Sequence, residues 1–248
     1  MLVKNLVIIS GASRGLGAAM AQRFAQHDHT LLLTISRSAL PWSFEAKSPV
    51  QHHHIQADLG SIQGTELART QLLERWPASA QRYILINNAG TVAPIAACKN
   101  LNDAQALSHA YQLNVLAPMS LCATFLQHSP THAQRRIVNI SSGAGRRAVA
   151  GWGVYGSSKA ALDYYTQVLQ LENPDLRAVS LAPGVIDTDM QTHIRAQDHD
   201  NFPDLDRFID LHQNQQLNTA EHVAQRIIAY LDSPQFGLTT LDDIRHYE

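Results

Sequence analysis

An apolar segment near the start of the chain leads into a glycine-rich turn and then into a predicted helix. Residues 6–10 are almost entirely apolar and rich in β-branched side chains, which is typical of a parallel strand buried on both faces. Gly11, Gly15 and Gly17 follow, before a helical pattern over 18–26. A strand, a turn and a helix in this order direct backbone N–H groups and the positive end of the helix dipole at a phosphate. Because the spacing is not Gly-x-Gly-x-x-Gly, a simple tight turn is the alternative.

Strand-like segments and helical patterns alternate along the rest of the chain. The predicted strands are 6–10, 31–36, 54–57, 83–87, 137–141 and 178–181, and the predicted helices are 18–26, 65–76, 103–126 and 155–171. Such alternation predicts an α/β fold, a Rossmann-type doubly wound parallel β-sheet with helices on both faces. A chain of 248 residues can bury one core of this kind, so we expect a single domain over residues 1–248. A less apolar stretch, 236–241, is a candidate last strand.

Composition argues against several classes of protein. The formal net charge is −2 and no basic run is present, which argues against nucleic-acid binding and against a polybasic membrane anchor. The apolar stretches are too short for a membrane span, and no secretory signal is visible. Cys98 and Cys122 are isolated, as structural thiols in a reducing cytoplasm would be. We expect no metal site, since the consecutive histidines at 52–54 point to alternating faces of a strand.

A tyrosine and a lysine four residues apart mark a candidate catalytic site. Tyr155 and Lys159 lie on one face of a predicted helix, and Ser142 stands thirteen residues before the tyrosine. A phenol titrates near pH ~10, and a neighbouring ammonium favours the phenolate and lowers this pKa. A serine hydroxyl can hold the oxygen that gains or loses the proton. The trio indicates proton transfer to a carbonyl or from an alcohol, although such a pair also occurs by chance on helix surfaces.

Further motifs carry a resemblance to a known family. They are Asn-Asn-Ala-Gly at 87–90, Leu-Asn-Val at 113–115, a strand ending in Ile-Ser-Ser at 140–142, and Pro-Gly-Val-Ile-Asp-Thr-Asp-Met at 183–190. With the glycine turn and the Tyr–Lys pair, they make the chain resemble the short-chain dehydrogenase/reductase family over nearly its whole length. Within that family, the sequences at 151–155, 171–177 and 187–191 resemble the branch of sepiapterin and benzil reductases.

The resemblance implies a role for each catalytic candidate. Tyr155 would donate a proton to the substrate carbonyl oxygen, and Ser142 would hydrogen-bond that oxygen. Lys159 would hold the nicotinamide ribose and lower the pKa of the tyrosine. Asn114 would position a water that links Lys159 to solvent.

The end of the second predicted strand points to NADP(H) as the cofactor. NAD-binding sites of this fold place an acidic residue there, but this chain has Ser36 and Arg37, and Arg14 lies within the glycine turn. Two guanidinium groups can clamp a 2′-phosphate, with Ser13, Ser36 or Ser38 as hydroxyl donors, unless the arginines are simply solvated. The resemblance extends the cofactor site to Gly11, Gly15, Leu16, Gly17, Asp58, Leu59, Asn87, Ala89, Gly90, Tyr155, Lys159, Pro183, Gly184, Val185 and Thr188.

The resemblance implies an NADPH-dependent carbonyl reductase that acts on a ketone or a vicinal dicarbonyl. Trp152 and Met190 would line the substrate site together with Ser142 and Tyr155. An NADP-dependent alcohol or sugar dehydrogenase working in the oxidative direction is the alternative. A non-catalytic NADP sensor is less favoured, because both the tyrosine and the lysine are present. The expected partners are a small-molecule carbonyl substrate and further copies of the chain, in a homodimer or homotetramer.

Three further regions carry expectations of their own. Residues 185–217 follow a Pro-Gly hinge and mix polar with apolar residues, so we predict a mobile flap over the substrate, with a packed insertion as the alternative. Arg146 and Arg147 are interpreted as a solvated loop pair in preference to an anion-steering pair. A role for Asp242 or Asp243 in substrate binding stays open.

Overall fold

The computed structural model describes residues 3–43 and 50–247. Within these ranges, the chain forms a wholly parallel sheet with the strand order β3-β2-β1-β4-β5-β6-β7. The strands are β1 (Asn5–Ser10), β2 (Thr30–Ser36), β3 (Gln51–Gln56), β4 (Arg82–Asn87), β5 (Gln134–Ile140), β6 (Leu176–Ala182) and β7 (Leu241–Asp243). The predicted α/β fold is confirmed. The strand order reverses beside β1, and sheets of this kind bind ligands at that point, outside the carboxyl ends of the strands.

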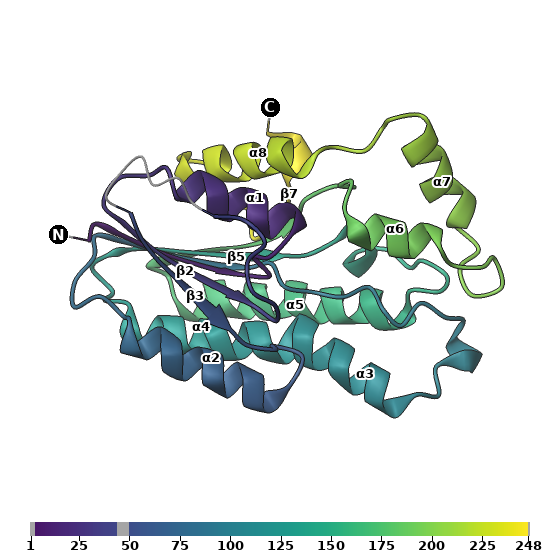
Figure 1. Cartoon of the computed structure of the whole chain (residues 1–248), viewed down its shortest axis with the longest axis horizontal. Helices are drawn as coiled ribbons and strands as arrows, with labels where there is room; N and C mark the ends of the chain where they lie inside the picture. Colours follow the sequence, from purple (N-terminus) through teal and green to yellow (C-terminus); the bar gives the residue numbers. More distant parts are fainter. Residues whose placement is uncertain (1–2, 44–49, 248) are drawn as a thin grey trace.

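Helices cover both faces of the sheet (Figure 1). α1 (Gly15–Phe24) and α8 (Ala220–Asp232) lie on one face, and α2 (Ile62–Glu74), α4 (Ala117–His128) and α5 (Gly153–Glu172) lie on the other. α6 (Asp189–Arg195) and α7 (Leu205–Gln213) lie beyond the carboxyl ends of the strands. Short 3₁₀ turns occur at Cys98–Asn100, Gly143–Gly145 and Ile244–His246.

The central strands are buried on both faces. In β1, Val7 and Ile9 pack in the layer of α1 and α8, whereas Leu6 and Ile8 pack in the layer of α2 and α4. This double burial explains why the strand shows no polar alternation. A third, smaller cluster joins Trp152 to residues of α6 and α7. No helix within the described ranges combines the length and the hydropathy needed to span a bilayer.

The predicted helix over 103–126 is interrupted in the structure. It consists of α3 (Ala104–Tyr111), a π-helical turn (Gln112–Leu116) and α4. Pro118 has no backbone N–H, so the carbonyl of Asn114, four residues earlier, cannot receive its usual α-helical hydrogen bond. The proline accounts for the wider turn, and such turns are frequent at functional sites.

The C-terminal part of the chain also departs from the sequence prediction. The last strand pairs Leu241 to Asp243 with β6, whereas the candidate 236–241 overlaps it only at its final residue. α8 was not among the predicted helices, although it packs closely on α1 and completes one layer.

Candidate active site

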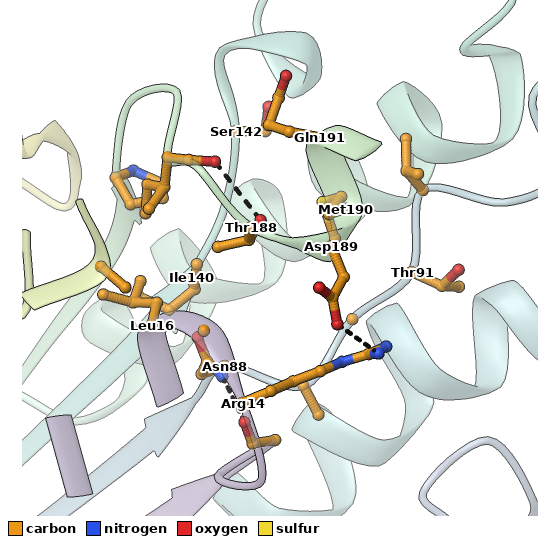
Figure 2. Close-up of a pocket in the computed structure, with 18 of the residues that line it drawn as sticks. Arg14, Leu16, Asn88, Thr91, Ile140, Ser142, Thr188, Asp189, Met190 and Gln191 are labelled. Atoms are coloured by element: carbon orange, nitrogen blue, oxygen red, sulfur yellow. Dashed lines mark hydrogen bonds and ion pairs between the residues drawn. The ribbon is translucent and has the colours of Figure 1, made fainter. Parts of the chain in front are cut away.

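A cavity of about 1420 Å³ opens at the carboxyl ends of the strands. Figure 2 shows side chains from the glycine turn, from the end of β5 and from the start of α6 around it. Most of the predicted cofactor residues line it: Gly11, Ser13, Arg14, Gly15, Leu16, Ser36, Arg37, Asp58, Leu59, Ala89, Gly90, Tyr155, Lys159, Pro183, Gly184, Val185 and Thr188. The predicted substrate residues Ser142, Trp152 and Met190 line it as well. Gly17, Asn87 and Asn114 do not.

The glycine turn is shaped by close backbone contacts. Gly11 has a φ of +71°, and an added Cβ there would lie 2.8 Å from Asn88 Nδ2. A Cβ at Gly17 would lie 2.2 Å from the carbonyl oxygen of Gly11. Gly17 therefore lets α1 pack against the turn, and its part in cofactor binding stays a prediction.

Asn88, not Asn87, holds the glycine turn. The backbone N–H groups of Asn88 and Ala89 donate to Ser10 Oγ at 3.0 and 3.1 Å. The Asn88 side chain donates back to the carbonyls of Ser10 and Gly11 at 3.1 and 3.2 Å. Asn87 is buried away from the cavity, and its amide donates to Asn139 Oδ1 at 2.8 Å. Asn87 does not line the cavity, because neighbouring residues at a strand end face opposite ways, and its place beside the cofactor stays a prediction.

The catalytic candidates come from β5 and α5. Ser142 follows β5, and its Oγ accepts a hydrogen bond from the backbone N–H of Ala144 at 3.2 Å. Tyr155 and Lys159 lie one turn apart on α5, with Nζ 5.8 Å from the centre of the tyrosine ring. Lys159 Nζ donates to the carbonyl oxygen of Ile140 at 2.8 Å, which links α5 to the end of β5. The structure thus brings all three predicted side chains to one wall of the cavity.

Burial decides the direction of both pKa shifts at this wall. Burial raises the pKa of Tyr155, and hydrogen bonding by Ser142 only partly opposes it. Lys159 is predicted to lower this pKa, but its ammonium is itself buried and donates to the carbonyl of Ile140. Burial lowers the pKa of Lys159 from 10.5 to about 8, against the attraction of Asp163. Tyr155 is therefore protonated at neutral pH, in the form of a proton donor.

Asn114 lies behind the wall, in the π-helical turn. It is fully buried, and its side chain pairs with the backbone of Thr91 through two hydrogen bonds of 2.9 Å. Its Nδ2 also donates to Ser158 Oγ at 3.0 Å. A Cβ at Gly90 would lie 3.2 Å from Asn114 Oδ1 and 3.5 Å from Lys159 Nζ. The glycine therefore keeps a space between the asparagine and the lysine.

The two predicted phosphate-binding arginines lie differently. Arg37 is exposed at the end of β2, on the cavity wall. Arg14 donates from Nη1 to Asp189 Oδ2 at 2.8 Å, and thereby connects the glycine turn to the start of α6 (Figure 2). Both partners of this ion pair are exposed, so its contribution to stability is about 0–1 kcal/mol.

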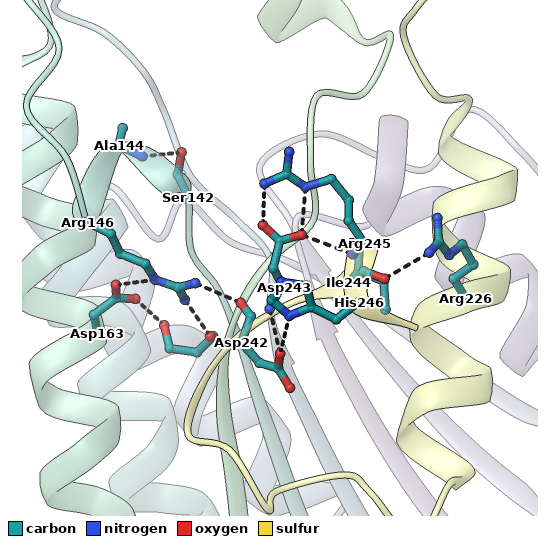
Figure 3. Close-up of polar contacts among 11 residues, drawn as sticks. Ser142, Ala144, Arg146, Asp163, Arg226, Asp242, Asp243, Ile244, Arg245 and His246 are labelled. Atoms are coloured by element: carbon teal, nitrogen blue, oxygen red, sulfur yellow. Dashed lines mark hydrogen bonds and ion pairs between the residues drawn. The ribbon is translucent and has the colours of Figure 1, made fainter. Parts of the chain in front are cut away.

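Arg146 is a structural residue. Its guanidinium donates to Asp163 Oδ2 at 3.1 Å and to the carbonyl oxygens of Asp242 and Ser180 at 3.0 Å (Figure 3). Asp163 also accepts from Ser141 Oγ at 2.6 Å and is almost fully buried. Arg146 is exposed and lines the cavity, but its guanidinium is bound to other elements, which the interpretation as a solvated loop residue did not include. This network fixes the segment that carries Ser142.

The two C-terminal carboxylates have different surroundings. Asp242 is buried and accepts hydrogen bonds from the hydroxyls of Tyr230 and Tyr247 at 2.7 and 2.5 Å. It does not line the cavity, so it is a structural residue. Asp243 lines the cavity and binds Arg245, whose Nε lies 2.8 Å from Asp243 Oδ1 (Figure 3).

An aromatic cluster around Trp152 borders the cavity. The Trp152 ring stacks on Phe202 at 5.1 Å and contacts Phe208 and Tyr155 at 5.3 and 5.4 Å. Phe202 and Phe208 belong to the segment 185–217, which forms α6 and α7 and packs on this cluster. The structure thus places the predicted flap over Trp152, and its mobility stays a prediction.

Comparison with known proteins agrees with this arrangement. Residues 5–199 match the sequence model of the short chain dehydrogenases. A benzil reductase ((S)-benzoin forming) of Bacillus cereus is 34% identical over 240 residues, covering 93% of this chain and 95% of the relative. A sepiapterin reductase of Bos taurus is 32% identical, covering 95% and 92%. The crystal structure of KRED1-Pglu superposes with a TM-score of 0.83 at 28% identity, covering 96% of this chain and all of that one. The chain belongs to the short-chain dehydrogenase/reductase family and is an oxidoreductase.

Proposed function

We propose that the protein is an NADPH-dependent reductase of ketones, with vicinal dicarbonyls as its preferred substrates. The observation that carries this proposal is that Ser142, Tyr155 and Lys159 open onto the same cavity as the glycine turn. A proton donor and a phosphate-binding turn on one cavity are what the reduction of a carbonyl by a dinucleotide requires.

The residues present fit a nicotinamide dinucleotide. The turn has the positive φ values at Gly11 and Gly15 that bring backbone N–H groups to a pyrophosphate. Gly90 lines the cavity where a side chain would press on Asn114 and Lys159. When bound, the cofactor supplies the hydride. Thr188 also lines the cavity, and we assign it to the carboxamide side of the nicotinamide.

The chain's own residues would manage the proton. Tyr155, held protonated by burial, donates to the carbonyl oxygen of the substrate, while Ser142 hydrogen-bonds that oxygen. Lys159, whose pKa is about 8, can give and regain a proton near neutral pH. Asn114 lies across the space at Gly90, where it would hold a water that returns the proton from solvent.

The preference for NADPH is inferred from the end of β2. Ser36, Arg37 and Ser38 line the cavity there, and none of them is acidic. An acidic side chain at this point would bind the ribose hydroxyls of NAD and repel a phosphate. Arg37 offers a planar guanidinium to a 2′-phosphate, and Arg14 becomes a second partner once it leaves Asp189.

The substrate class is inferred from the apolar wall and from the relatives. Trp152, Met190 and Phe208 give the cavity an apolar and partly aromatic wall, which suits an aryl or other hydrophobic ketone. The relatives described above are named for the reduction of benzil, a vicinal diketone, and of sepiapterin. Benzil is therefore the first substrate to test.

The decisive experiment is a substrate panel read by NADPH absorbance. Purified protein is mixed with NADPH or NADH and with benzil, sepiapterin or a simple aldehyde, and with NADP⁺ and a series of alcohols and sugars. We expect fast, benzil-dependent oxidation of NADPH and slower oxidation of NADH. Turnover confined to alcohols or sugars with NADP⁺ would establish the oxidative dehydrogenase instead. Cofactor binding without any turnover would indicate a sensor.

We further propose that the whole chain is one NADP-binding domain that acts as a homodimer or homotetramer in the cytoplasm. Leu116, Tyr164 and Leu171 expose 51%, 71% and 81% of their surface, and the last two lie seven residues apart on one face of α5. The described cysteines, Cys98 and Cys122, are both free thiols, which suits a reducing compartment. Light scattering of the wild type and of Leu171→Glu tests the assembly, and a wild-type monomer would contradict it.

A further inference from the structure

Two histidines of β3 make polar contacts that the catalytic site does not use. β3 is the edge strand beside β2, and His52 and His54 share one of its faces while His53 faces the other way. His54 Nδ1 lies 3.1 Å from Thr34 Oγ1, and its Nε2 lies 3.1 Å from the carbonyl oxygen of Ser38. These contacts join the edge strand to the turn at the end of β2.

The partners of His54 determine where its proton lies. We assign the hydrogen to Nε2 of His54, because the carbonyl of Ser38 can only accept, and Nδ1 of this neutral tautomer then accepts from the Thr34 hydroxyl. Thr34 has then used its proton and accepts from His52 Nε2 at 2.9 Å. Burial lowers the pKa of His54, which favours the neutral ring that this arrangement needs. The result is a chain of hydrogen bonds that runs from His52 through Thr34 and His54 to Ser38.

The chain of hydrogen bonds ends on a turn that lines the cavity. The carbonyl of Ser38 receives a second hydrogen bond, from Ser36 Oγ at 2.7 Å. Gln56, the next residue of β3 on the same face as His54, donates from Nε2 to the carbonyl of Arg37 at 3.3 Å. Two successive carbonyls of the turn are thus held by β3. Ser36, Arg37 and Ser38 line the cavity at the place where we propose the 2′-phosphate binds.

We propose that His54 is a positioning residue for NADPH, which acts by holding the Ser36–Ser38 turn in the conformation that receives the 2′-phosphate. This inference rests on the proposed preference for NADPH. His54 itself does not line the cavity, so its effect passes through the backbone of Ser38. The turn follows β2, which lies on the other side of β1 from β4 and β5, so we expect its effect to fall on the 2′-phosphate and not on proton transfer by Tyr155.

The test is calorimetric titration with NADP⁺, NAD⁺ and 2′,5′-ADP, which needs no catalysis. His54→Phe keeps a flat ring but loses both hydrogen bonds, and should weaken NADP⁺ and 2′,5′-ADP by about fivefold, with NAD⁺ changed by less than about twofold. His54→Gln retains an Nε2 donor for Ser38 and should recover most of that loss. His53→Gln, on the exposed opposite face, is the matched control and should bind like the wild type.

The possible outcomes distinguish a failure of the role proposed for His54 from a failure of the proposed preference for NADPH. A wild type that prefers NADP⁺, with the same NADP⁺ to NAD⁺ ratio in His54→Phe, would overturn the role of His54 and leave the proposed function standing. An equal loss for all three ligands would also overturn it, since that pattern reports general damage to the fold. A wild type that binds NAD⁺ as tightly as NADP⁺ would overturn the proposed preference and, with it, the inference.

Discussion

Burying the charged ammonium of Lys159 should lower the stability of the folded protein, so an inactive variant without this charge should be more stable than the wild type. Lys159 is 4% exposed, and burial lowers its pKa from 10.5 to about 8. Because one pKa unit corresponds to about 1.4 kcal/mol, holding the charged form inside the fold costs about 3 kcal/mol at neutral pH. Replacing Lys159 by Met removes this cost and keeps a side chain of similar length. It also leaves the carbonyl of Ile140 without its donor, a loss of about 1 kcal/mol.

We therefore expect Lys159→Met to raise the free energy of unfolding at pH 7 by about 2 kcal/mol while abolishing turnover. The stability advantage of Lys159→Met over the wild type should shrink as the pH rises. The folded pKa of Lys159 lies below the unfolded one, so the unfolded wild type binds more protons between pH 8 and 10.5. The wild type gains stability across that window, and the advantage of the variant should vanish near pH ~10. Asp163 keeps its ion pair with Arg146 in the variant and is not left unpaired.

Urea unfolding of the cofactor-free protein at pH 7 and pH ~9.5 measures both effects. Lys99→Met makes the same change at an exposed lysine and should shift the free energy of unfolding by less than about 0.5 kcal/mol at either pH. A Lys159→Met protein that is less stable than the wild type at pH 7 would refute the reasoning. So would a stability difference that does not change between the two pH values.

Three further results are expected. Tyr155→Phe should lower turnover by about 10²–10⁴-fold while NADPH still binds, and near-normal turnover would remove Tyr155 from the role of acid. Arg37→Ala should cost about 1.5–3 kcal/mol of NADPH binding, measured by titration, with little change for NADH; an equal loss for both cofactors would make Arg37 a structural residue. Hydrogen exchange over residues 185–217 should slow when NADP⁺ and a substrate analogue bind, because α6 and α7 would close over the aromatic cluster around Trp152. Equal protection in the two states would mean that the segment is a packed insertion.

Features that depend only on residues close together in the sequence could be predicted from the sequence alone. The β1 strand, the glycine turn and α1 form one continuous segment, so their residue types and spacing are sufficient to predict this strand–turn–helix unit. Tyr155 and Lys159 share a helix face because they are four residues apart. The wholly parallel sheet was predictable because strands buried on both faces carry uninterrupted apolar side chains.

Features that depend on segments far apart in the sequence were decided only by the tertiary structure. Arg146 is held by Asp163, Ser180 and Asp242, which come from three different elements, so its own loop sequence could not show that it is structural. The pKa of Tyr155 rises because the folded chain excludes water from the phenol, and burial of that kind has no signature in the Tyr–Lys spacing. Local sequence determines which groups the site contains. Long-range packing determines their partners and their exposure to water, and therefore their charge.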